Sequence, residues 1–163
     1  MFDDLLRANT SYQQDYGLGH LSAQAQKHVA VLTCMDTRID PLGMLGLKPG
    51  DAKIVRNAGA RVSEDALRSL ILATNLLSCE RVAVVQHTDC AMSKNSDEQL
   101  QAAVTKSSGA DASGIDFLAV PDQKQTLRED VEKVRRCPQI GAKVIVAGFI
   151  YDVHSGALEL VVS

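Results

Sequence analysis

Short apolar runs alternate along the chain with longer segments of helical periodicity. Three runs, at residues 28–33, 52–56 and 81–86, are rich in Val, Ala, Leu and Ile, as in strands buried within a parallel sheet. Between the second and third runs, apolar residues over 63–77 recur every three or four positions, which indicates an amphipathic helix. A strand, a helix and a second strand in this order predict a βαβ unit with a right-handed crossover.

Local signals predict where two helices begin. Ser63 precedes two acidic residues, and a hydroxyl cap followed by negative charge stabilises the first turn of a helix. A short helix is expected over residues 42–47, because Asp40 can cap it and Pro41 suits its first turn. Both helices would follow directly from strand ends.

The second half of the chain is more polar. Small and polar residues after position 90 favour a mobile loop near the strand ends, containing a short helix over 97–105. A further helix is expected to follow Pro121 and Asp122 and to end at 137–138. Two last apolar runs, 143–153 and 157–162, flank a turn at 154–156 and predict a C-terminal hairpin that closes the sheet.

The N-terminal residues 1–27 form an arm. Within it, residues 2–17 have a loose helical spacing with a thin apolar stripe of Phe2, Leu5, Leu6, Tyr12 and Tyr16. A helix with such a stripe needs a surface to lie on. The pattern alone leaves open whether that surface belongs to the same chain or to a partner.

Length and composition fit one globular domain over residues 1–163. Hydrophobic residues make up 45% and charged residues 23%, which is ordinary globular usage and argues against disorder. The order of strands and helices, rather than the composition, indicates an α/β fold with a central, mainly parallel sheet flanked by helices. The net charge of −3 gives no reason to expect nucleic acid or a membrane as partner. The N-terminus lacks the features of a signal peptide, so a cytoplasmic location is expected.

Metal-binding side chains follow two of the strands. Cys34 ends the first run, and His87 and Cys90 follow the run at 81–86. The carboxyl ends of neighbouring parallel strands meet at one edge of a sheet, so these three side chains are expected to surround one point. Two thiolates and one imidazole suit zinc, and three protein ligands with a free fourth position are typical of a catalytic site. The alternative is two structural thiols beside a core histidine.

Two charged residues accompany the first cysteine. In an extended segment Cys34, Asp36 and Arg38 share one face, so all three can look toward the metal. An arginine can hold a carboxylate by a two-point contact, and that carboxylate can accept a hydrogen bond at the metal site. A surface ion pair is the plainer interpretation. Cys79 and Cys137 are expected to be packing thiols rather than disulfide partners.

Taken together, the sequence resembles the β-class carbonic anhydrases, especially their short prokaryotic members. The resemblance rests on Cys34-x-Asp36-x-Arg38, on His87-x-x-Cys90 and on Arg56-Asn-Ala-Gly59 between them, and it runs from about residue 29 to residue 92. Two departures accompany it. Ala91 stands where the family usually has glycine, and the chain has no tryptophan, which weakens the case for the bicarbonate regulation known in some members.

The resemblance implies an enzyme that binds one Zn²⁺ per chain and hydrates CO₂ reversibly to bicarbonate, through a zinc-bound hydroxide. Cys34, His87 and Cys90 would be ligands, Asp36 and Arg38 would form a catalytic dyad, and Asp36 would itself take the fourth zinc position in a closed state. It also implies a homodimer or a dimer of dimers, with the N-terminal arm lying across the partner. Two alternatives are a carbonyl sulfide or carbon disulfide hydrolase and a non-catalytic, zinc-stabilised interaction domain.

Overall fold

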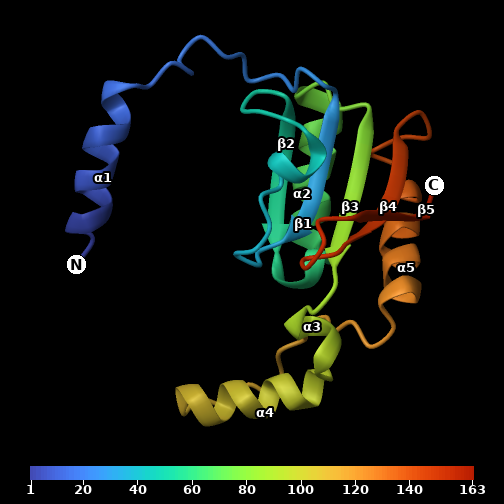
Figure 1. Cartoon of the computed structure of the whole chain (residues 1–163). Coiled ribbons are helices and arrows are strands. Elements are labelled where there is room, and N and C mark those ends of the chain that lie inside the picture. The colour runs from blue at the N-terminus through green and yellow to red at the C-terminus, as the bar shows by residue number, and fades with distance from the viewer.

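The computed structural model describes residues 1–163 and is organised around one five-stranded sheet in the order β2-β1-β3-β4-β5 (Figure 1). Four of its strands are parallel, and β5 pairs antiparallel with β4. The strands are β1 (Val29–Cys34), β2 (Ala52–Asn57), β3 (Arg81–His87), β4 (Ile145–Tyr151) and β5 (Leu158–Val162). The predicted α/β class and C-terminal hairpin are therefore confirmed.

Two helices cover one face of this sheet. Helix α2 (Glu64–Leu76) packs on β1 and β2, and α5 (Gln123–Arg135) packs on β3, β4 and β5. Ser63 caps α2 by accepting a hydrogen bond from the Ala66 amide, as predicted, and Asp122 caps α5 in the same way. Buried residues of both helices interlock with alternate strand residues to form the main core, which includes Ala30, Leu32, Val82, Val84, Leu70, Leu127 and Val131.

The opposite face of the sheet has no long helix on it. Because side chains alternate between faces along a strand, Val29, Ala83 and Phe149 point away from the main core. With Leu45 and Leu47 they line an apolar groove of about 260 Å³. This side of the chain presents an uncovered hydrophobic surface.

The predicted helix over 42–47 is shorter than expected. Only a 3₁₀ turn forms, η1 (Gly43–Leu45), because Gly46 adopts the left-handed conformation at φ 65° and ends it. Asp40 still caps the turn, accepting hydrogen bonds from the amides of Leu42 and Gly43. The capping signal was correct, but the length was wrong.

The segment after β3 forms two helices that project beyond the carboxyl ends of the strands (Figure 1). The sequence predicted a loop directly after residue 90, but that segment begins with a short helix, α3 (Ala91–Lys94). The helix predicted over 97–105 is present and longer, as α4 (Asp97–Ser108). A capping box formed by Ser96 and Gln99 explains why this helix begins at Asp97.

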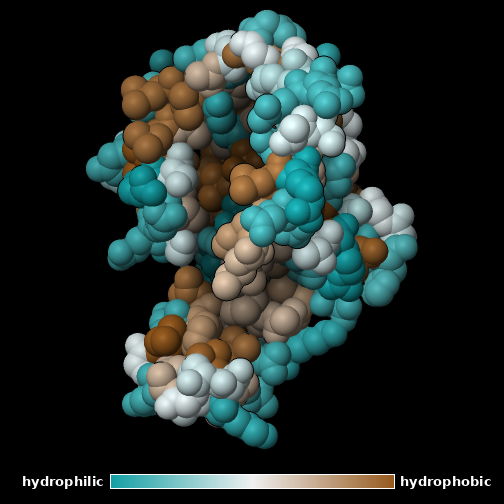
Figure 2. All heavy atoms as spheres, turned by 90° about the vertical axis from the view of Figure 1, so that its left-hand side faces the viewer, coloured by the Kyte–Doolittle hydropathy of each residue, from teal (hydrophilic) through white to brown (hydrophobic).

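Helix α1 (Asp3–Gln14) stands apart from the sheet, at the end of a long connection (Figure 1). None of its residues is buried, and Phe2, Leu5, Leu6, Tyr12 and Tyr16 are all exposed. Apolar side chains lie at the surface among hydrophilic ones on this side of the molecule (Figure 2). No helix in the structure is long and apolar enough to cross a lipid bilayer.

Candidate metal centre

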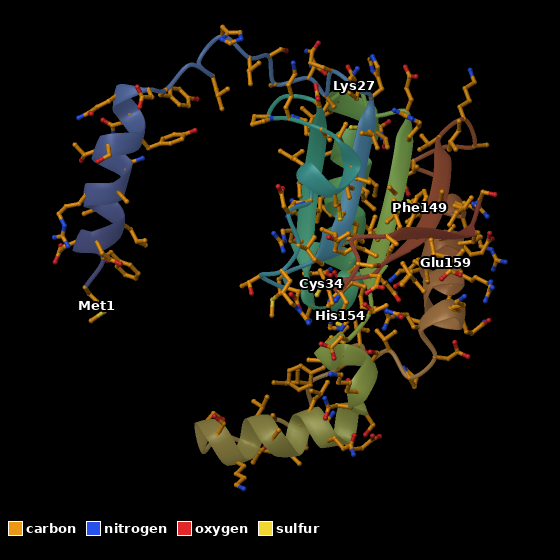
Figure 3. The ribbon with its side chains drawn as sticks, viewed as in Figure 1. Met1, Lys27, Cys34, Phe149, His154 and Glu159 are labelled. Carbon is orange, nitrogen blue, oxygen red and sulfur yellow. The ribbon has the colours of Figure 1, made fainter.

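The three predicted metal ligands converge at the carboxyl edge of the sheet. Cys34 ends β1 and His87 ends β3, and these neighbouring parallel strands are in register, with Thr33 opposite Val85. Cys90 caps α3. The two sulfur atoms and the imidazole lie within 4.8 Å of one another, and all three residues are buried. Figure 3 places Cys34 at the end of the sheet that faces α3 and α4.

The imidazole of His87 is oriented for a metal. Its Nδ1 lies 2.8 Å from the carbonyl oxygen of Thr88, and because a carbonyl can only accept, Nδ1 carries the proton. The lone pair is then on Nε2, which is buried without a hydrogen-bond partner. A buried nitrogen left unpaired costs free energy, so a ligand for it is expected at this point.

The pKa values of the two thiols shift in opposite directions. A hydrogen bond from Cys90 lowers the pKa of Cys34 to about 4, and burial opposes this shift only in part. The same contact, together with burial, raises the pKa of Cys90 far above its usual range. A bound cation would stabilise both thiolates and would therefore favour loss of the proton that remains on Cys90. The donor set therefore fits a zinc ion.

Residues from β2 and η2 (Ala58–Ala60) hold the Cys34 segment in place. The amide of Gly59 donates to Sγ of Cys34 at 3.4 Å, and Gly59 has φ 74°. A Cβ at this position would lie 3.1 Å from Met92 Cγ, so both the conformation and the space favour glycine. Arg56 donates to the carbonyl oxygens of Cys34 at 2.9 Å and Asp36 at 2.6 Å.

Asp36 and Arg38 form the predicted pair. Nε and Nη2 of Arg38 donate to the two carboxylate oxygens of Asp36 at 2.9 and 2.8 Å, and the Arg38 amide donates to the same carboxylate. These hydrogen bonds hold the pKa of Asp36 well below its usual range. Asp36 lies outside the three-residue cluster, with Oδ2 at 3.9 Å from Nε2 of His87.

Two residues at this site were not found by sequence reasoning. Asp89 accepts from Nη1 of Arg38 at 2.7 Å, and Gln123, at the start of α5, donates to the carbonyl oxygen of His87 at 2.8 Å. The place of Asp89 between two ligands was a usable signal, because loop residues that flank metal ligands often orient them. Nothing in the spacing of Gln123 relates it to a residue 36 positions earlier.

Apolar side chains surround the sulfur atoms. Cys34 and Cys90 belong to a second hydrophobic cluster, separate from the main core, with Ile39, Ala60, Met92 and Val120. We call these four residues the apolar wall. Cys79 and Cys137, by contrast, are free buried thiols within the main core, as predicted.

Comparisons with known proteins find similarity to carbonic anhydrases in sequence and in fold. A family model described as carbonic anhydrase matches residues 29–158. β-Carbonic anhydrase 1 of Mycobacterium tuberculosis is 32% identical over 96% of this chain and 95% of its own length, and a carbon disulfide hydrolase of Acidianus is 30% identical over 98% and 90%. The crystal structure of a carbonic anhydrase from Streptococcus mutans superposes with a TM-score of 0.92 at 36% identity, covering 98% of this chain and 96% of that one.

Replacing Cys90 with serine should remove the metal. A hydroxyl is a much weaker metal ligand than a thiolate. We therefore expect metal affinity to fall by about 100-fold or more, which is at least the loss seen when a residue that only orients a ligand is removed. Elemental analysis of the purified variant measures this as metal per chain. Cys137→Ser, which alters a thiol in the main core, is the matched control and should keep its metal; a fully loaded Cys90→Ser protein would contradict the ligand role.

Proposed function

Because this chain belongs to the β-carbonic anhydrase family, we propose that it hydrates CO₂ reversibly to bicarbonate and a proton, with one Zn²⁺ held by Cys34, His87 and Cys90. The observation that carries the proposal is the convergence of these three ligand atoms beside a paired carboxylate and guanidinium. When bound, zinc supplies a Lewis acid that makes water a nucleophile near neutral pH. The protein would hold the ligands in position and surround them with buried apolar side chains.

Asp36 acts as a fixed hydrogen-bond acceptor in this proposal. Its carboxylate stays ionised because Arg38 lowers its pKa, so it does not keep a proton at neutral pH. It can instead accept a hydrogen bond from a water molecule or hydroxide and aim the oxygen lone pair at the substrate carbon. Arg38 keeps that carboxylate in place by its two-point contact.

Asp36 is also our candidate for a fourth metal ligand. Its Oδ2 lies 3.9 Å from Nε2 of His87, so a change of side-chain rotamer brings it toward the metal site. That movement breaks its hydrogen bonds with Arg38. We therefore propose that Asp36 binds the metal only when Arg38 releases it, and that the arrangement described above leaves the fourth position to the nucleophile.

The apolar wall suits a small substrate without a dipole. CO₂ has no net dipole, and the buried side chains of Ile39, Ala60, Met92 and Val120 beside the two sulfur atoms would disfavour water there. Carbon disulfide also has no dipole, and carbonyl sulfide has only a small one. The 30% identity to a carbon disulfide hydrolase makes such a hydrolase our second candidate.

Two assays on one zinc-loaded preparation test the proposal. Stopped-flow measurement with a pH indicator follows CO₂ hydration, and a sulfide assay follows the turnover of carbonyl sulfide or carbon disulfide. We expect rapid hydration and little sulfide release. Sulfide release without hydration would favour the second candidate, and inactivity in both assays with full zinc occupancy would favour a non-catalytic, zinc-stabilised domain.

The charged pair should matter for rate and not for metal content. Asp36→Asn keeps the shape of the side chain but removes its charge, and we expect kcat to fall by about 100-fold or more, as when a positioned acid or base is lost. Arg38→Ala should lower kcat similarly because Asp36 then has no fixed orientation. Stopped-flow rates and zinc analysis of each variant measure both quantities, and a fully active variant of either residue would remove it from the mechanism.

We further propose that the protein is a homodimer in which α1 of one chain packs on an apolar surface of the other. Helix α1 has an exposed apolar stripe but no contact with its own sheet, while the groove lined by Val29, Ala83 and Phe149 lies uncovered on the same chain. An exposed stripe and an exposed groove of this kind both favour association. Exchange of arms between two copies would cover them together.

Serine at both Leu5 and Leu6 should weaken the dimer. Both leucines are exposed in the single chain and would be buried in the proposed dimer. Losing their burial should cost about 3 kcal/mol or more of the free energy of association, which corresponds to a dissociation constant at least about 100-fold higher. Light scattering after gel filtration should report twice the 17.5 kDa chain mass for the wild type and a monomer for the variant at low concentration. Replacing Asp4 and Arg7 on the same helix with serine is the control; a wild-type monomer would refute the proposal, and a wild-type tetramer would extend it.

A further inference from the structure

The guanidinium of Arg38 is held by two acidic residues from different loops. Nε and Nη2 donate to Asp36, while Nη1 donates to Oδ2 of Asp89 at 2.7 Å and Nη2 donates to the Asp89 carbonyl oxygen at 3.2 Å. All three guanidinium nitrogens are therefore engaged. Asp36 occupies one edge of the plane, and Asp89 occupies the adjacent edge.

We infer that Asp89 is a positioning residue that locks Arg38 in the orientation required to hold Asp36. The inference rests on the proposed function, in which the orientation of Asp36 matters for the rate. Arg38 is otherwise a long, half-exposed side chain, and one carboxylate alone would not fix it. With an anchor at both edges, the guanidinium has one favoured position.

The backbone at Asp89 is shaped for this contact. Asp89 has φ 59°, in the left-handed region that aspartate, asparagine and glycine tolerate best. In this conformation both its carboxylate and its carbonyl oxygen reach Arg38. Because Cys90 follows directly in the chain, the anchor for Arg38 is built into the loop that supplies a metal ligand. The dyad is thereby kept in register with the metal.

Lys94 completes an alternating row of charges. Its ammonium contacts Oδ1 of Asp89, leaving Oδ2 for Arg38. Asp36, Arg38, Asp89 and Lys94 thus alternate in sign along the edge of the site. With Lys94 on its other oxygen, Asp89 keeps Oδ2 turned toward Arg38. Each of the two carboxylates beside Arg38 then has a positive neighbour, which reduces the repulsion between them.

Loss of the Asp89 anchor should release Asp36. Without Asp89, the Arg38 side chain can turn away from Asp36 into solvent. The Asp36 carboxylate, whose Oδ2 lies 3.9 Å from Nε2 of His87, can then turn toward the metal site. Asp89 therefore favours the arrangement with a free fourth position. Because Asp89 also contacts Lys94, the part of its effect that passes through Arg38 has to be isolated by comparing variants with and without Arg38.

The test is a double-mutant cycle between Asp89 and Arg38. Asp89→Asn keeps the size and the tolerance of positive φ but loses the charge, and Asp89→Gly also removes the side chain. We expect kcat for CO₂ to fall by about 10-fold in Asp89→Asn and further in Asp89→Gly, with KM within about 2-fold, since Asp89 does not touch the substrate. Added to Arg38→Ala, Asp89→Asn should change kcat by less than about 2-fold.

A second readout does not depend on activity. In the cobalt-substituted protein, visible absorption reports thiocyanate binding at the metal, and a released Asp36 competes with that anion. Asp89→Asn should weaken thiocyanate binding about 5-fold, with no further loss in the Arg38→Ala background. Unchanged affinity and kcat in Asp89→Asn, or equal losses with and without Arg38, would overturn the inference.

A matched control and the wild type separate this inference from the proposed function. Asp65→Asn removes an exposed carboxylate that pairs only with Arg68 on α2, and it should leave kcat and thiocyanate affinity unchanged. If the wild type binds metal but does not hydrate CO₂, the proposed function fails, while the thiocyanate cycle still measures the coupling. If the wild type is active and the cycle shows no coupling, only the role of Asp89 fails.

Discussion

The parallel pairing of β1 with β3 is the constraint on which the site depends. Parallel strands end at the same edge, and the register that places Thr33 opposite Val85 brings Cys34 beside the end of β3. A slip of one residue would turn alternate side chains to the other face and separate the ligands. Burial of Leu32 and Val84 against α2 and α5 fixes that register, so the main core determines the geometry of the metal centre.

Hydrogen bonds from backbone groups as well as side chains then orient the candidate ligands. The Thr88 carbonyl fixes the tautomer of His87, and the Gly59 amide points at the sulfur of Cys34. Arg56 holds the two carbonyl oxygens of the Cys34–Asp36 segment. Such contacts position ligands before a metal arrives, so less free energy is needed to organise the site on binding.

Sequence patterns predicted most of the fold and the convergence of Cys34, His87 and Cys90, because strand runs and caps such as Ser63 are local signals. Cys34 and His87 could be brought together by the rule for parallel strand ends. The contact of Asp89 with Arg38 was missed because it joins residues 51 positions apart and depends on a positive φ that no spacing reveals. Helix α3 was missed because four residues are too few for a helical period to be visible.

Relatives named for carbonic anhydrase and for carbon disulfide hydrolase activity are both similar to this chain, so under the proposed function its selectivity would depend on groups around the ligands such as the apolar wall. That wall is assembled from separate segments: the Val120 amide donates to the Met92 carbonyl, and Arg61 reaches both the Leu118 carbonyl and the largely buried Asp130 of α5. Changes in these connections would move the residues beside the sulfur atoms without altering the three ligands themselves. The sheet thus places the candidate metal ligands, and the loops that cover them form their apolar surroundings.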